Sequence, residues 1–353
     1  MIRRAPVLTL AILATITLAC SAQKPASHAT LVYAMGREPT VTVPLFTGSR
    51  EENEDVADQL FLHLAVFAPN AKGTADAMMV PALAKAWHRI DPLTLVFDID
   101  PRARWHDGTP VTAHDVIFTW GLATSPKLNS DARLEPIASV EAVGTMSVRV
   151  RFKRPSVEQV YTFGFLIQPL PAHLLEKLAP ESISTSDFAQ HPSGDGPYRF
   201  ERKVAGQSIE LRADTAFFLG RPTISRLLLR TIVDPTARVN AFVSGETDVL
   251  DKIPVQSLPQ VQQHAGGRVI DPGSNVLVYM LFNTRSATDS GRPHPILSDP
   301  RVREALTLAL DRNSIAQATF GPAAHAVDAA QSQLWGWITP GAVATPAFDA
   351  AKA

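Results

Sequence analysis

The sequence predicts a protein of the α/β or α+β class that is built from more than one domain. Its 353 residues exceed the roughly 250–300 residues at which a single hydrophobic core stops growing. Short runs of alternating apolar and polar residues, typical of half-buried strands, are interspersed with segments of helical spacing. With 45% hydrophobic and 19% charged residues, the composition is typical of a globular chain.

The first predicted elements are a strand, a long loop and a helix. TLVYAM (30–35) alternates like a strand, and GREPTVTVPLFTGSR (36–50) is a Pro- and Gly-bearing loop that is long for a simple connection. ENEDVADQLFLHLAVF (52–67) begins with acidic residues, as the helix dipole favours. Its apolar residues Val56, Leu60 and Leu64 recur at helical spacing, so we expect one helix over this segment.

Further strands and a second long helix follow along the chain. The helix is predicted over DPRVREALTLALDRNSIAQATF (299–320), because an amphipathic spacing places five apolar residues on one face: Val302, Ala305, Leu306, Ala309 and Leu310. The remaining strands show the alternation of half-buried strands: LTLVFDID (93–100), SVRVRF (147–152), a hairpin in GPYRFERKVAGQSIELRAD (196–214) with its turn at Ala205-Gly206, and NVLVYMLFN (275–283).

The N-terminus predicts export. MIRRAPVLTLAILATITLAC (1–20) has a basic start and an uncharged apolar stretch, shorter than the ~20 residues of a spanning helix. Cys20, the only cysteine, stands where bacterial lipoproteins are cleaved and lipidated. Residues 21–29 are a polar tether. Because Thr17 occupies a position where lipoprotein signals usually have an aliphatic residue, two alternatives stay open: a soluble form cleaved near Ala22, and a chance surface thiol.

Composition and motifs exclude several function classes. The 33 basic and 34 acidic residues give a formal net charge of −1, so no nucleic-acid partner is expected. The chain contains no G-x-S-x-G, P-loop, G-x-G-x-x-G, H-E-x-x-H or C-x-x-C motif. Each of these motifs would indicate a catalytic, nucleotide-binding, redox or metal-binding site. We therefore predict no enzyme, no cofactor and no metal site.

One stretch, WHDGTPVTAHDVIFTW (105–120), has two interpretations. As a catalytic or metal site, His106, Asp107, His114 and Asp115 would act together, but adjacent residues rarely point at one ion and the i, i+4 spacing is missing. In the structural interpretation, Asp107-Gly108 is a pair typical of a turn. Thr112 and Asp115 then form a capping box at the start of a helix. We favour the structural interpretation.

Seven segments resemble the bacterial extracellular solute-binding proteins of family 5, the peptide/nickel type served by ABC importers. Asp195, Asp214 and Phe217-Phe218 depart from the usual Thr, Asn and Tyr-Trp of that pattern. The segments occur in family order: PALAKAW (81–87), LTLVFDIDPRARWHDGTPVTAHDVIFTW (93–120), PLPAHLLEK (169–177), GDGPYRF (194–200), RADTAFFLGRPTISRLLLRTI (212–232), SGETDVL (244–250) and LFNTRSATDSGRPHPILSDPRVREALTLALDRNSI (281–315).

The resemblance implies a class II periplasmic-binding-protein fold, in which two lobes joined by a hinge close on a solute. Residues 30–66 and 190–262 would form the first lobe, residues 67–189 an extra domain in it, and residues 263–353 the second lobe. TPAFDAAKA (345–353) resembles the start of a helix after which relatives continue. We therefore expect the second lobe to be truncated.

Family position also implies where a ligand would bind. The loop after the first strand would contribute Phe46, Thr47, Gly48 and Ser49, and the strand ending at residue 283 would contribute Tyr279, Phe282 and Asn283. A stacking wall is a further possibility for two tryptophans that share one face of an extended segment, Trp335 and Trp337. Core packing or turn capping is the alternative for the aromatic residues and for Asn283.

The function implied is capture of a peptide or similar small solute and its delivery to an inner-membrane ABC permease. The protein would act as a monomer in the periplasm or at the outer face of the cell membrane, held by a lipid if Cys20 is modified. Two alternatives remain: a secreted or lipid-anchored hydrolase that uses the His-Asp stretch, and an envelope lipoprotein with no role in transport. A fold does not fix the ligand, so peptides, nickel chelates, opines and sugars all remain open.

Overall fold

The computed structural model describes residues 30–48, 50–69, 76–128, 132–270, 278–321, 324–327 and 345–353. Among them, no helix is long and apolar enough to cross a membrane. The candidate lipidation site Cys20 and the predicted contacts Ser49, Trp335 and Trp337 lie outside the described residues.

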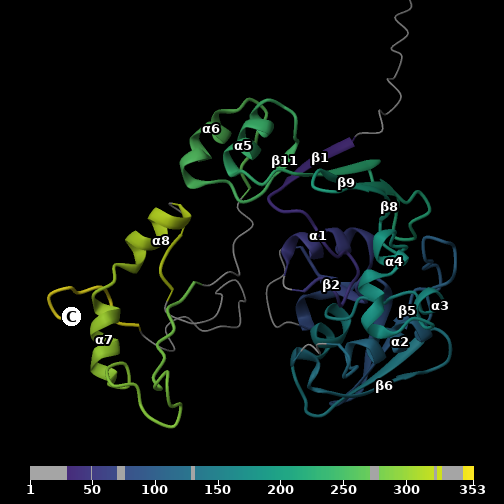
Figure 1. Cartoon of the computed structure of the whole chain (residues 1–353). Helices are drawn as coiled ribbons and strands as arrows, with labels where there is room; N and C mark the ends of the chain where they lie inside the picture. The colour runs from purple at the N-terminus through teal and green to yellow at the C-terminus, as the bar shows by residue number, and fades with distance from the viewer. Residues whose placement is uncertain are drawn as a thin grey trace, which may run out of the picture.

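A five-stranded sheet is formed by segments far apart in the sequence (Figure 1). Its order is β11-β1-β10-β9-β8. β1 lies parallel to β10 and β11, and β9 is antiparallel to both of its neighbours. The predicted first strand and hairpin are confirmed, and Gly206 turns the hairpin at φ +71°. The strands are β1 Thr30–Met35, β8 Tyr198–Val204, β9 Ser208–Ala213, β10 Arg226–Thr231 and β11 Val249–Leu250.

Two further sheets are antiparallel. Four strands pair in the order β4-β5-β7-β6, and helix α2 packs against β6 and β7. The predicted strands within 93–100 and 147–152 are confirmed as β5 and β7. The strands are β4 Ala84–Asp91, β5 Thr94–Ile99, β6 Ile137–Ala142 and β7 Ser147–Phe152, with β2 Ala65–Phe67 and β3 Met79–Pro81 forming a separate pair.

The helices are short, and the described ones are as follows. The α-helices are α1 Glu51–Leu60, α2 Ala113–Ala123, α3 Ala172–Leu175, α4 Asp187–Gln190, α5 Pro235–Val243, α6 Leu258–Gln263, α7 Pro300–Leu308 and α8 Arg312–Phe320. The 3₁₀-helices are η1 Asp76–Met78, η2 Ala132–Leu134, η4 Pro180–Thr185 and η5 Val255–Ser257, and η3 Tyr161–Phe165 is a π-helix.

One continuous core joins the first two sheets. Leu60 of α1, Phe97 of β5 and Leu211 of β9 are fully buried in the same cluster of side chains. Trp105, from the HDG segment, is 1% exposed in it. No described residue after Leu229 belongs to this cluster, so α7 and α8 do not contribute to it.

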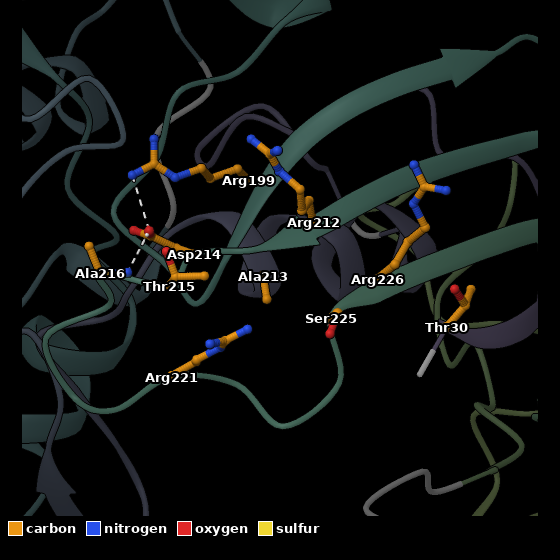
Figure 2. Close-up of a pocket in the computed structure, with 10 residues that line it drawn as sticks. All are labelled: Thr30, Arg199, Arg212, Ala213, Asp214, Thr215, Ala216, Arg221, Ser225 and Arg226. Atoms are coloured by element: carbon orange, nitrogen blue, oxygen red, sulfur yellow. Dashed lines mark hydrogen bonds and ion pairs between the residues drawn. The ribbon is translucent and has the colours of Figure 1, made fainter. Parts of the chain in front are cut away.

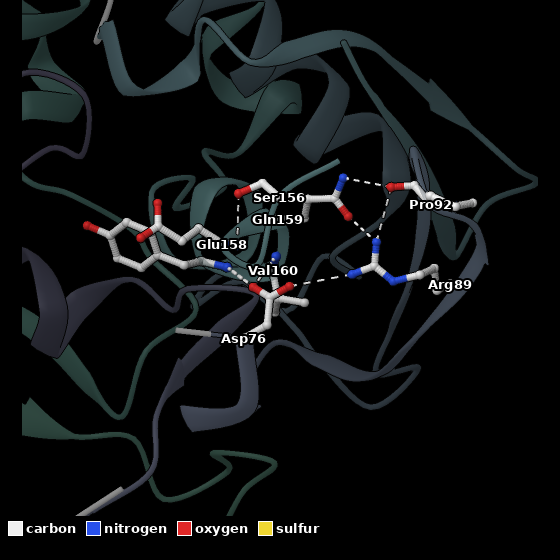
Figure 3. A network of polar contacts seen from close by, with 8 residues as sticks. Asp76, Arg89, Pro92, Ser156, Glu158, Gln159 and Val160 are labelled. Atoms are coloured by element: carbon white, nitrogen blue, oxygen red, sulfur yellow. Dashed lines mark hydrogen bonds and ion pairs between the residues drawn. The ribbon is translucent and has the colours of Figure 1, made fainter. Parts of the chain in front are cut away.

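A partly buried polar network bonds the start of the π-helix (Figure 3). Asp76 Oδ1 accepts hydrogen bonds from the backbone N–H groups of Val160 (2.7 Å) and Tyr161 (3.3 Å). Its other oxygen lies 3.5 Å from Arg89 Nη2. Arg89 also donates to the side chain of Gln159, which is fully buried, and the Gln159 amide donates to Pro92 O (3.1 Å). The network provides hydrogen bonds for the buried Gln159 amide and for Asp76 Oδ1, whereas Asp76 Oδ2 has only the ion pair with Arg89.

The predicted helix over 52–67 is correct in type but wrong in its end. The α-helix stops at Leu60, and residues 65–67 form β2. Residues 194–196 bond backbone groups that would otherwise pair within a further helical turn. Gly196 N–H donates to Leu60 O (2.8 Å), and Asp195 Oδ1 accepts from Leu62 N–H (2.9 Å). A tertiary contact therefore overrides the helical spacing of Leu64.

Two predictions in the C-terminal part are wrong. The described residues 278–283 form no strand, because no described strand pairs with them. The segment 299–320 is two helices, since Asp311 accepts a hydrogen bond from Ser314 N–H (3.1 Å) and starts α8 as its N-cap. Leu306, predicted on the buried face, is 40% exposed, whereas Leu308 is 5% exposed.

Candidate functional site

The carboxyl edge of the parallel strands is the candidate site. β1, β10 and β11 end side by side in the sheet, and the loops 36–50, 232–234 and 251–254 follow them. In open α/β sheets, ligands bind outside the carboxyl ends of the strands. Most of the loop 36–50 is described, has no regular secondary structure, and is the long loop that the sequence predicts.

One buried side chain of α1 holds the long loop in place. Asn53 is 2% exposed. Its Oδ1 accepts from Thr40 N–H (2.8 Å), and its Nδ2 donates to Thr47 O (2.8 Å). A single amide thus connects two points of the loop seven residues apart in the sequence, and it fixes the backbone that leads to Gly48.

Carboxylates outnumber cations at this edge. Glu51 and Asp55 come from the first turns of α1, and Asp251 and Lys252 follow β11. Lys252 Nζ lies 2.7 Å from Glu51 Oε2. Burial, followed by the charges of Glu51 and Asp251, raises the pKa of Asp55 to about 6. Burial and the charge of Asp251 also raise the pKa of Tyr33. A second cation, the buried Arg238, donates to Ile232 O (2.9 Å) and Val233 O (3.0 Å) at the same edge.

The structure places the described part of the predicted loop contacts at this edge. Gly48 is exposed with φ +65°. Phe46 is half-buried and packs against the core, and Thr47 is half-buried with its carbonyl bonded to Asn53. Gly48 and the outer surfaces of Phe46 and Thr47 are thus the parts that a ligand could reach.

Two of the three predicted contacts on the second segment, Tyr279 and Asn283, are solvent-exposed. Tyr279 is 71% exposed, and Phe282 is half-buried. Asn283 Oδ1 accepts from Arg285 N–H (3.0 Å), which is the turn-capping alternative expected for this residue. Among the described residues, no hydrogen bond or ion pair joins 278–283 to the loop 36–48. A role for Tyr279, Phe282 and Asn283 in ligand binding stays a prediction.

The four His-Asp residues do not converge on one point. His106 Nδ1 accepts from Gly194 N–H (3.1 Å), and its Nε2 lies 3.0 Å from Gly196 O. Asp107 pairs with His173 (2.7 Å) and His114 with Glu176 (3.0 Å). Asp115 accepts from Thr112 N–H (2.8 Å), as in the predicted capping box.

Each member therefore has a separate structural partner. The turn at Gly108, with φ +94°, is also present. Over the described ranges, no group of three or more His, Cys, Asp or Glu side chains is arranged to hold a metal ion. The described structure supports the structural interpretation of the stretch.

Comparison with known proteins gives the family. Residues 78–353 match the model of the bacterial extracellular solute-binding proteins, family 5 Middle. The chain belongs to this family. It is 32% identical over 266 residues to a protein of Brucella ovis that is named as an ABC transporter peptide-binding protein, covering 74% of this chain and 48% of the relative. The chain thus spans about half the length of the curated relatives it matches.

Solved structures of other proteins share the fold. The oligopeptide-binding protein AppA of Bacillus subtilis, in complex with a nonapeptide, superposes with a TM-score of 0.72 at 23% identity over 92% of this chain and 62% of its own. NikZ of Campylobacter jejuni, in complex with Ni(L-His), gives 0.65 at 27% identity over 82% and 54%. The α/β class and the periplasmic-binding-protein fold are therefore confirmed for this family 5 protein. The boundaries of the predicted lobes stay a prediction.

In this family 5 chain, two acids that depart from the family pattern have structural partners. Asp195 is 1% exposed and accepts from Leu62 N–H. Burial raises its pKa to about 8. Asp214 Oδ1 accepts from Ala216 N–H (3.0 Å) and from Arg199 Nη2 (3.1 Å). Both carboxyl groups thus bond backbone N–H groups of loop segments.

Sequence reasoning missed Asn53, Asp55, Asp251 and Lys252. A signal existed for Asn53, because it lies three and seven residues before Val56 and Leu60, on the apolar stripe of α1. A polar residue in such a stripe indicates a buried hydrogen bond. Asp55 and Asp251 gave no local signal, since only the parallel pairing of β1 with β11 brings their segments together.

Proposed function

We propose that this protein is the extracytoplasmic substrate-binding component of an ABC importer. It captures a peptide or similar small solute and delivers it to an inner-membrane permease. The match of residues 78–353 to a solute-binding family carries this proposal, and the Brucella relative is named as peptide-binding. Such a protein works without breaking bonds. Closure buries the ligand, and affinity depends on contacts made only in the closed state.

The protein would act as a monomer in the periplasm or at the outer face of the cell membrane, anchored there if Cys20 is lipidated. The ligand would lie between the carboxyl edge of the first sheet and the second lobe. On the first side, the loop 46–49 and the carboxylates of Glu51, Asp55 and Asp251 would face it. A peptide ammonium group suits this acidic edge, because opposite charges attract strongly where water is partly excluded.

Binding is tested by thermal unfolding with a library of di- to nonapeptides, and with nickel–histidine as a separate ligand class. A ligand at 100 times its Kd stabilises the protein by about 2.7 kcal/mol. Peptides with a free amino terminus are expected to raise the Tm more than their N-acetylated counterparts. Affinity should also rise from pH 5 to pH 7, as Asp55 loses the proton that its pKa of about 6 retains.

Two matched variants test whether Asp55 itself causes the preference for peptides with a free amino terminus. Asp55→Asn should reduce the difference between free and acetylated peptides, whereas Asp187→Asn, at an exposed aspartate of α4, should leave it unchanged. Absence of a Tm response to every peptide would contradict the peptide assignment. Hydrolysis of the peptides that His106→Ala abolishes with the fold intact would instead support the hydrolase alternative.

A further inference from the structure

A row of arginines crosses the five-stranded sheet at the end opposite the candidate binding edge. Arg199 of β8 pairs directly with Arg212 of β9, and Arg212 with Arg226 of β10. Arg226 pairs in turn with Thr30, the first residue of β1. Directly opposed side chains lie on one face about 5 Å apart, where like charges destabilise a sheet. An anion bound over the row would relieve that repulsion.

Acidic side chains neutralise part of this row. Arg199 Nη2 lies 3.1 Å from Asp214 Oδ1. Arg226 Nη2 lies 3.1 Å from Glu201 Oε2 and 3.4 Å from Glu210 Oε2. Among the described residues, Arg212 and the nearby Arg221 have no ion pair with an acid. Two guanidinium groups are therefore available to an external anion.

The four arginines and Asp214, but not Glu201 and Glu210, line a hollow of about 640 Å³ (Figure 2). Ligand pockets in proteins range from about 300 to 1,000 Å³, so the space accepts a small ester or a lipid headgroup. In Figure 2, Arg221 points from its loop into the space below the strands. The hydroxyl groups of Thr30 and Thr215 also line it, and they can donate hydrogen bonds to an anion.

We propose that this hollow binds a phosphate group, with Arg212 and Arg221 as its main ligands. Guanidinium forks match phosphate oxygens bidentately. A free phosphate ion offers four acceptor oxygens, and the phosphodiester of a lipid headgroup offers two non-bridging oxygens, each of which can accept hydrogen bonds from a different arginine. The group would be the headgroup phosphate of an anionic phospholipid or a free phosphate ion, and both present anionic phosphoryl oxygens to the arginines.

The position of the hollow favours the lipid source. Thr30 follows Cys20, the predicted lipidation site, by ten residues, and ten extended residues span at most about 35 Å. If Cys20 is lipidated, the hollow lies within that reach of the bilayer surface. The formal net charge of the chain is −1, so attraction to an anionic surface must come from a local basic group such as this row. The proposal does not depend on which solute the protein captures.

The test uses the full chain and two probes. Binding of inorganic phosphate is measured by calorimetry at constant ionic strength, and binding to phosphatidylglycerol vesicles by sedimentation, with phosphatidylcholine vesicles as the reference. The double variant Arg212→Gln/Arg221→Gln should weaken binding at least tenfold. The control Arg154→Gln/Arg292→Gln removes the same charge at two exposed arginines elsewhere and should change binding less than twofold.

The outcomes separate the two sources. Binding of both probes, or of vesicles alone, that the arginine variant loses supports the headgroup source. Binding of phosphate alone supports the free ion. Equal losses in both double variants, or no binding of either probe, would overturn the proposal. Should the double variant fold poorly, Arg221→Gln alone, on an exposed loop, is expected to retain the fold and to weaken binding. Peptide binding by the same preparation shows separately whether the solute site is intact.

Discussion

Asp195 is an almost completely buried acid, and burial raises its pKa. It lies in the segment that ends α1, and its Oδ2 has no hydrogen-bond partner among the described residues. An unfolded aspartate titrates near pH 3.9, whereas burial raises the pKa of folded Asp195 to about 8. Between these values the folded protein holds a proton that the unfolded chain has lost.

Stability should therefore fall as pH rises from about 4 to 8, by about 1.4 kcal/mol per pH unit from this group alone. Asp195→Asn keeps the acceptor for Leu62 N–H and removes the charge. The difference in free energy of unfolding, variant minus wild type, should grow across that range in urea titrations and become constant above pH 8. Asp187→Asn, an exposed control, should show no such slope. Parallel curves for wild type and Asp195→Asn would contradict the assignment.

Asn53 should determine the order of the loop 36–48. Asn53→Ala leaves Thr40 N–H and Thr47 O without their partner, and each unsatisfied buried group costs about 1–3 kcal/mol. We expect a loss of about 2–4 kcal/mol in the free energy of unfolding, together with faster proteolysis within the loop. Asn240→Ala, at an exposed position of α5, should change stability by less than about 0.5 kcal/mol. Equal effects of the two variants would refute this role.

The sequence is informative at the residue scale where a signal is local. The capping box at Thr112 and Asp115 and the turn at Gly108 depend on neighbours within four residues, and both predictions are confirmed. Asp195, by contrast, bonds Leu62, which is 133 residues away. No local pattern could predict that contact.

At the scale of elements, the junction between α1 and the 194–196 segment sets where the helix ends. A Cβ atom built on Gly194 would lie 1.8 Å from Leu60 O, and one on Gly196 would lie 2.6 Å from Gln59 O. The two backbones can approach this closely only because both residues are glycine. His106 bonds the same two glycines, so the HDG segment, α1 and β8 meet at one point.

Gly194→Ala should consequently cost about 3 kcal/mol or more, because backbone rather than a mobile side chain blocks the new methyl group. Gly206→Ala serves as the comparison. Its φ is +71°, but no atom lies within 4 Å of the added Cβ, so only the left-handed conformation is penalised, by about 1–2 kcal/mol. Chemical unfolding of the two variants measures both costs. A smaller loss for Gly194→Ala than for Gly206→Ala would show that the junction adapts.

Element types were predicted better than element ends, and the reason is physical. Alternation specified β7, whose residues are buried in turn, as in a half-buried strand. β5 was correct in type although it is buried along almost its whole length. The end of α1 depends on the distant 194–196 segment. The break at 309–311 did have a local signal, since Asp311 three residues before Ser314 is an N-cap pattern inside the predicted helix. The apolar spacing on both sides of Asp311 predicted one continuous helix in spite of this N-cap pattern.

At the scale of the whole molecule, burial is distributed unevenly. The two main sheets share one core, whereas in 278–320 the only buried apolar residue is Leu308. Val278, Tyr279, Met280 and Leu281 are 63–83% exposed. Exposed apolar side chains in such a run mark a surface that another group covers.

Few buried contacts also mean that little free energy is needed to open the segment. Chymotrypsin should therefore cleave first at Tyr279–Phe282, before the core of residues 30–263. The cleavage rate should be proportional to the fraction of molecules in which this segment is open. If the segment closes on the captured solute, a peptide at 100 times its Kd should slow this cleavage about 100-fold. Cleavage at the exposed loop residue Leu219 should not change. Mass spectrometry of timed digests follows both sites, and equal rates at Tyr279 with and without a peptide that binds would show that the segment is not part of the ligand site.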